Sequence, residues 1–117
     1  MHLDPLAGEP VSFLAAALDS MKDPVLVADT EHRILFLNEA ATRHYSEGAD
    51  LLGRSLLDCH NPQSQQMMLE VLEALRGGED ERLITDNEKY RIYMRAVRDQ
   101  TGELLGYYER YEPPRGA

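Results

Sequence analysis

Residues 23–41 read DPVLVADTEHRILFLNEAA, and this stretch decides the fold. Two short runs of aliphatic, β-branched and aromatic residues, 25–29 and 34–37, flank a polar segment. Such runs separated by a polar turn are typical of a β-hairpin. Asn38 follows directly and suits the N-cap of a helix that runs toward residue 45. The stretch therefore predicts two antiparallel strands that lead into a short helix.

Further helices are expected on both sides of this hairpin. Residues 11–21 carry apolar side chains at helical spacing, and Asp23-Pro24 ends that helix because proline disfavours helical geometry in the residue before it. Short helical turns are expected over 48–53 and 54–57, and an irregular polar connection over 58–61.

A longer helix is expected after this connection. Asn61-Pro62 is a typical helix start, with Asn as the cap and Pro in the first turn, and Gly77-Gly78 ends the helix. The apolar residues of this helix fall largely on one face. They are Met67, Met68, Val71, Leu72 and Leu75.

The last third of the sequence is typical of strands. The runs 82–85, 90–97 and 104–111 are separated by polar turns, which predicts a meander. The whole order indicates an α+β fold with a five-stranded antiparallel sheet, short helices on one face and an N-terminal helix. Residues 1–21 are expected to form a tail and a cap helix, 22–112 the domain itself, and 113–117 a second tail.

Composition limits the classes of function. With 117 residues and 43% hydrophobic content, the chain suits one compact domain. Cys59 is the one cysteine, so no intrachain disulfide forms and a cytoplasmic location is expected. The formal net charge of −9 disfavours binding to nucleic acid or an anionic membrane surface.

Several segments resemble the PAS family. Residues 23–41 resemble its opening hairpin and Asn-capped helix, 52–56 (LGRSL) its Gly-Arg-Ser turn, and 97–106 (VRDQTGELLG) the hairpin between its last two strands. The resemblance implies a non-catalytic sensor and interaction module of bacterial signal transduction, which binds a small ligand or a protein partner. Residues 59–64 (CHNPQS) are similar to a subset of bacterial PAS domains with a C-H-x-P-x-S segment.

The resemblance also implies where a ligand binds, because PAS domains hold ligands between the sheet and the helices. The candidate pocket residues are Cys59, His60, Met67, Met68, Leu72 and Met94. Flavin photochemistry is not expected, since Leu56 stands where the flavin-binding light sensors of this fold carry a cysteine. A coumaroyl chromophore would need a cysteine later in the chain than Cys59.

Haem is the alternative cofactor, because imidazole, thiolate and thioether sulfur all bind iron. His60 is the candidate ligand, with Cys59 or one of the two methionines at 67 and 68 as a second. The competing interpretation makes the methionines core residues and His60 a hydrogen-bonding residue of a turn. Haem-binding PAS domains usually place the histidine inside the long helix, and residues 63–76 contain none.

Other chemistry at Cys59 is less favoured. Asp58, Cys59 and His60 are consecutive, and such neighbours rarely converge on one metal ion, so no metal site is expected. A Cys-His pair of adjacent residues does not form a nucleophile and its base. Cys59 is either a redox switch, activated by the neighbouring imidazolium, or an inert small hydrophobe.

Two surfaces favour association with other chains. The N-terminal helix carries more apolar surface than one stripe needs, which predicts a homodimer contact; the residues are Val11, Phe13, Leu14, Leu18 and Met21. Strand alternation places Tyr93 on one face with Arg91 and Arg95, and Tyr107 on one face with Tyr111, so at least part of this set is expected on the outer face of the sheet. This set is either an interface or a group of half-buried strand residues.

Overall fold

The computed structural model describes residues 10–116, with side chains from Phe13 onward. The elements in chain order are α1 (Pro10–Asp19), β1 (Val25–Asp29), β2 (Ile34–Leu37), α2 (Glu39–His44), the 3₁₀ turns η1 (Gly48–Leu51) and η2 (Leu56–Cys59), α3 (Pro62–Arg76), β3 (Glu81–Asp86), β4 (Arg91–Arg98) and β5 (Leu104–Glu112). None of the helices in this part of the chain is long and apolar enough to cross a membrane.

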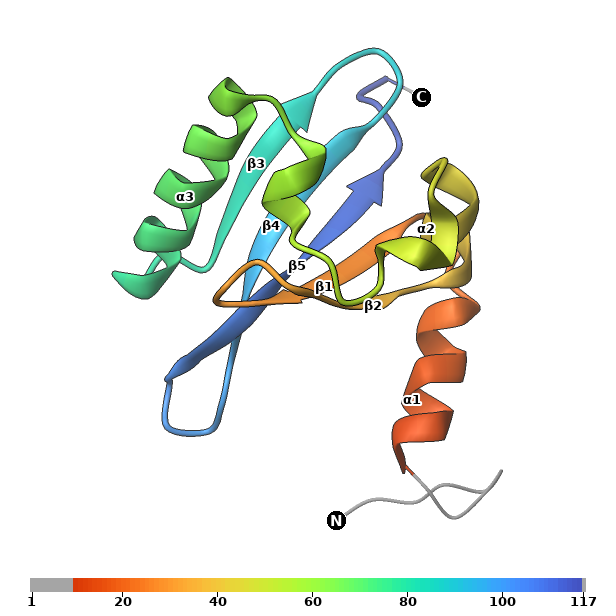
Figure 1. Ribbon diagram of the computed structural model, residues 1–117, viewed down its shortest axis with the longest axis horizontal. Coiled ribbons are helices and arrows are strands. Elements are labelled where there is room, and N and C mark those ends of the chain that lie inside the picture. Colours follow the sequence, from red (N-terminus) through yellow and green to blue (C-terminus); the bar gives the residue numbers. More distant parts are fainter. Residues whose placement is uncertain (1–9, 117) are drawn as a thin grey trace.

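The five strands form one antiparallel sheet in the order β2-β1-β5-β4-β3 (Figure 1). The last strand, β5, therefore lies in the centre and joins the first hairpin to the C-terminal meander. Glu109 of β5 pairs with Leu26 of β1 on one side and Met94 of β4 on the other. The predicted five-stranded sheet is confirmed.

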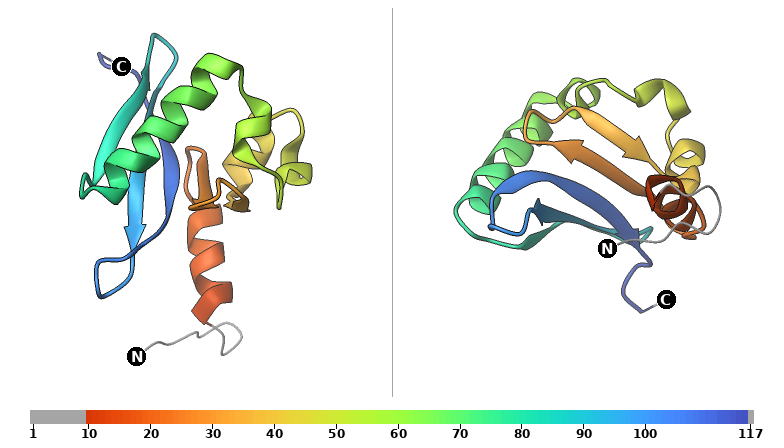
Figure 2. Two further views of the ribbon diagram at one scale, coloured as in Figure 1. Left: turned by 60° about the vertical axis from the view of Figure 1, so that its left-hand side comes forward. Right: turned by 90° about the horizontal axis from the view of Figure 1, so that it is seen from below.

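The helices α2 and α3 and the two 3₁₀ turns arch over one face of the sheet, and α1 projects from its edge (Figure 2). The core fills the space between this layer and the sheet. Its buried members are Leu26, Ala28, Ile34, Leu37, Ala41, Leu51, Leu56, Met68, Val71, Leu72, Leu75, Met94 and Tyr107.

Asn38 holds three elements together. Its Oδ1 accepts hydrogen bonds from the backbone N–H of Ala41 at 2.9 Å, which caps α2, and of Val25 at 3.0 Å, at the start of β1. Its Nδ2 donates to the carbonyl oxygens of Leu18 and Asp23, both at 3.0 Å. The fully buried side chain thus hydrogen-bonds to four backbone groups at the junction of α1, β1 and α2.

The central pairing of β1 and β5 depends on Gly106. A Cβ at this position would overlap the carbonyl oxygen of Ala28 in the neighbouring strand. The absent side chain lets the two backbones approach where β5 begins its pairing with β1.

Several element boundaries differ from the prediction by one or two residues, and the differences at α1 and η2 have a local cause. Helix α1 ends at Asp19 instead of residue 21, because Ser20 bonds back to the carbonyl of Ala17 through its Oγ at 2.7 Å. The second helical turn lies at Leu56–Cys59, later than expected, because Ser55 caps it with its side chain. Cys59 therefore belongs to a 3₁₀ turn and not to an irregular connection.

Candidate functional site

The structure brings four of the six predicted pocket residues together. Met68, Leu72 and Met94 are buried between α3 and the sheet, and Met67 packs against them while partly exposed. Cys59 is exposed at the end of η2. The predicted pocket region is thus the interior below α3, with Cys59 outside it.

His60 lies half-buried beside α3. Its Nδ1 is 2.8 Å from the carbonyl oxygen of Leu56. A carbonyl only accepts, so Nδ1 carries a proton, and the neutral form of this imidazole has its lone pair on Nε2. Gln65 donates from its amide to the carbonyl oxygens of Leu57 and His60, both at 2.9 Å, which fixes the turn before α3.

The thiol of Cys59 is not activated. Desolvation raises its pKa, and the nearby carboxylates of Glu47 and Asp58 add to the effect. An activated redox cysteine needs the opposite shift. Nor does any group of three or more metal-ligating side chains converge within residues 10–116.

The inner face of β5 carries a polar row that sequence reasoning missed. Tyr107, Glu109 and Tyr111 all point under the helices and are buried. A hydrogen bond of 2.8 Å joins the Tyr107 hydroxyl to Nδ1 of His32, and another of 2.8 Å joins the hydroxyls of Tyr111 and Tyr45. The interior of this domain therefore contains ionisable groups as well as apolar ones.

Burial perturbs these groups. Desolvation raises the pKa of Glu109 to about 7 and raises the pKa values of Tyr45, Tyr107 and Tyr111, while it lowers the pKa of His32. At neutral pH the tyrosines and His32 are neutral, and Glu109 is partly protonated. Glu109 is the one member of the row whose charge changes near neutral pH.

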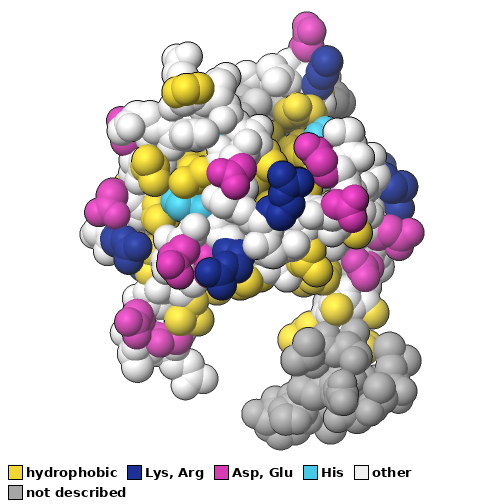
Figure 3. Space-filling view, viewed as in Figure 1, with side chains coloured by type: hydrophobic (Ala, Val, Ile, Leu, Met, Phe, Trp, Pro, Cys, Tyr) yellow, Lys and Arg dark blue, Asp and Glu magenta, His cyan; other side chains and the backbone are white. Residues whose placement is uncertain are grey.

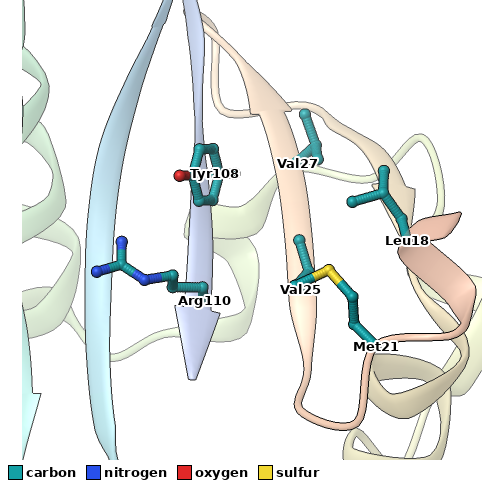
Figure 4. Close-up of a pocket in the computed structure, with 6 residues that line it drawn as sticks. All are labelled: Leu18, Met21, Val25, Val27, Tyr108 and Arg110. Carbon is teal, nitrogen blue, oxygen red and sulfur yellow. The ribbon is translucent and has the colours of Figure 1, made fainter. Parts of the chain in front are cut away.

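The outer face of the sheet holds a cleft of about 370 Å³ (Figure 4). Its lining comes from α1 and its connection, from β1 and from β5: Leu18, Met21, Val25, Val27, Tyr108 and Arg110. Figure 4 shows the side chains of Leu18 and Met21 turned toward the two valines of β1. The cleft is mostly apolar, with one guanidinium at its rim.

A cationic and aromatic cluster continues this outer face. The Arg110 guanidinium lies 4.4 Å from the ring centroid of Tyr93 and pairs with the carboxylates of Glu81 and Glu112. Tyr93 therefore lies on the outer face with its arginine neighbours, so part of the tyrosine set faces outward, as expected. Tyr107 and Tyr111 face the interior.

Apolar side chains are also exposed on α1, the projecting helix. Phe13 is 41% exposed, Leu14 59% and Met21, just past the helix end, 46%. Figure 3 shows apolar atoms along this helix, while the body of the domain carries interspersed acidic and basic groups on the same view. Val11, the fifth predicted interface residue, has a side chain outside the described residues.

A second, smaller cleft of about 210 Å³ lies beside β2.

A family model described as PAS domain matches residues 14–112. The chain belongs to the PAS domain family. PAS domains are commonly sensor modules of signal transduction and are generally non-catalytic. The C-H-x-P-x-S subset stays a prediction.

Solved structures show the same fold. A C-terminal domain from Streptococcus mutans superposes with a TM-score of 0.77 at 19% identity, covering 96% of this PAS domain chain and 90% of that one. The PAS domain of Bordetella pertussis BvgS superposes with a TM-score of 0.63 at 23% identity, covering 88% of this chain and 85% of that one. The Vibrio cholerae Aer2 receptor, described as a dual PAS-heme oxygen sensor, superposes with a TM-score of 0.57 at 20% identity, covering 80% of this chain and 95% of that one. No curated protein matches this chain.

Proposed function

We propose that this PAS domain is a non-catalytic sensor and interaction module of bacterial signal transduction, which works as a homodimer in the cytoplasm. The observation that carries the proposal is the apolar cleft between α1 and the outer face of the sheet, together with the exposed apolar residues of α1 itself. A ligand below α3, or a protein partner on the outer face, provides the signal.

A second copy of the chain suits this surface. Phe13 and Leu14 project from a helix that touches the rest of the domain at one end, and the adjoining cleft is open and apolar. Burying apolar surface is favourable by roughly 25 cal/mol per Å². In a two-fold dimer each α1 covers the same surface on its partner, so both helices lose their exposed apolar area together.

Strand β1 links the interior to this surface. Leu26 faces the core, while Val25 and Val27 on either side of it line the outer cleft. Asn38 adds a second link, because its amide bonds both the last turn of α1 and the start of β1. A ligand that repacks the core below α3 would therefore shift the equilibrium between two arrangements of the paired helices.

Sedimentation tests the dimer. We expect the intact chain to sediment as a dimer, and the Leu14→Asp variant and the chain lacking residues 1–21 to sediment as monomers, because each loses apolar contact area on α1. Leu105→Asp is the matched control, since Leu105 is as exposed but lies in β5. The proposal fails if the intact chain is a monomer, or if Leu14→Asp and Leu105→Asp behave alike.

A haem-dependent gas or redox sensor is the second candidate, and the orientation of His60 favours it. With Nδ1 donating to Leu56, the imidazole presents Nε2 as a free lone pair, which is the arrangement of most metal-ligating histidines. This candidate predicts a Soret band in the purified protein that His60→Ala shifts and His44→Ala leaves unchanged. A colourless protein that takes up no added haemin eliminates it.

A further inference from the structure

Glu109 occupies an unusual place for a charged residue. It lies at the centre of the central strand, and its side chain is 5% exposed. Its partners across the sheet are Leu26 and Met94, both in the core. None of the described residues donates a hydrogen bond to its carboxyl group, whose pKa is shifted by burial alone.

No cation of the described chain reaches this carboxyl group. The arginines at 91, 95 and 110 in β4 and β5 form their ion pairs with Glu81 and Glu112, on the outer face of the sheet. On the inner face the hydroxyls of Tyr107 and Tyr111 bond to His32 and Tyr45, and no hydrogen bond joins any of these four side chains to Glu109. A buried carboxylate without a partner is strongly unfavourable, so its position demands a proton or an external cation.

The surroundings of Glu109 can adapt to a guest. Met94 adjoins it on β4, and Met68 and Met67 of α3 belong to the same core. Methionine side chains are unbranched and repack readily, which suits a site that opens around a ligand. Their apolar character favours a guest with a hydrocarbon tail over a bare metal ion, which would need several oxygen ligands.

We propose that the interior between α3 and the sheet binds a small organic amine, with its ammonium group paired to the carboxylate of Glu109 and its hydrocarbon part among the methionines. This inference rests on the proposed function, because it names the ligand class of the sensor pocket. An ammonium group supplies both the charge and the hydrogen bonds that the carboxylate lacks. A neutral apolar ligand would supply neither the charge nor the hydrogen bonds.

A pair of probes with one alkyl chain tests the charge preference. n-Butylamine is protonated across the neutral range, like the lysine side chain it resembles, whereas n-butanol is neutral. Titrations of the full chain, followed by NMR at the amides of Glu109 and Met94, should give at least tenfold tighter binding for the amine at about pH 8. The amine affinity should fall toward about pH 6, as Glu109 gains its proton, while the alcohol affinity stays constant.

Variants separate the anchor from the fold. Glu109→Gln should reduce the amine affinity at least tenfold and leave the alcohol affinity unchanged. Glu103→Gln removes one negative charge from an exposed turn and should alter neither. Circular dichroism of both variants confirms that the domain is folded.

The possible results distinguish the two proposals. Equal affinities for amine and alcohol, or an amine affinity that Glu109→Gln leaves unchanged, overturn the charged anchor while keeping an interior pocket. Binding of neither probe in the millimolar range also overturns the inference. The homodimer is judged separately, by the sedimentation of Leu14→Asp.

Discussion

Replacing Glu109 by Gln should remove a fall in stability that the native protein suffers as pH rises. Burial raises the pKa of Glu109 from 4.5 to about 7 in the folded protein. In the unfolded chain the carboxyl group returns to its ordinary pKa. Between these two values the folded state holds a proton that the unfolded state has lost, so the free energy of unfolding decreases with pH and levels off above about pH 7.

The size of the loss follows from the two pKa values. Each pKa unit corresponds to about 1.4 kcal/mol, so a change from 4.5 to about 7 amounts to roughly 3 kcal/mol of lost stability. Glutamine has nearly the same shape and no proton to lose. We therefore expect Glu109→Gln to match the native protein near about pH 4 and to be about 3 kcal/mol more stable near pH 8.

Urea denaturation followed by far-ultraviolet circular dichroism measures this difference at a series of pH values and constant ionic strength. His32 acts in the opposite direction, since its lowered pKa makes stability rise with pH up to about 6.5. The difference between native protein and variant cancels that contribution. Parallel stability curves for the two proteins between about pH 5 and 8 would refute the reasoning, as would an equal effect from Glu103→Gln.

Three further substitutions test the fold around the site. Asn38→Ala should lower the free energy of unfolding by on the order of 3 to 5 kcal/mol in urea titrations, because four backbone groups lose their buried partner. Gly106→Ala should cost at least about 2 kcal/mol and weaken amide-exchange protection in β1 and β5, since its methyl group would overlap the Ala28 carbonyl. Arg110→Ala should cost about 1 kcal/mol by thermal unfolding, because the cation over Tyr93 and its ion pairs are lost.

Two substitutions of the same residue types at exposed positions serve as controls for Asn38→Ala and Arg110→Ala. Asn87→Ala removes two local turn hydrogen bonds at an exposed site, so it should cost about 1 kcal/mol or less. Arg82→Ala breaks an exposed ion pair with Glu79 and should leave the free energy of unfolding nearly unchanged, because solvent screens this pair. If these changes destabilise the protein as much as Asn38→Ala and Arg110→Ala do, the assigned contacts are not the cause.

The elements of this fold could be predicted because their signals are local. The hairpin, the cap at Asn38 and the start of α3 at Asn61-Pro62 each depend on neighbouring residues, and all are confirmed. The convergence of Leu72 and Met94 could be expected from the apolar face of α3 and the alternation of β4. Cys59 lies outside the interior below α3. The side chain of Ser55 caps the 3₁₀ turn η2, and Cys59 is the exposed last residue of that turn.

The polar row of the interior could not be predicted in this way. Along β5 both alternating sets contain tyrosine and a charged residue, Tyr107 with Glu109 and Tyr108 with Arg110, so alternation does not tell which set faces inward. The register against Leu26 and Met94 decides it, and pairing across the sheet is not a local property. His32 looks like an exposed turn residue, yet its left-handed backbone conformation and the hydroxyl of Tyr107 bring it inside.

Native mass spectrometry of the intact chain as purified tests the central claim most directly, because it counts subunits and detects a bound small molecule in one spectrum. The account predicts a dimer that carries additional mass, which dissociates on activation and is absent from the denatured chain. A monomer at the mass of the bare polypeptide would contradict it.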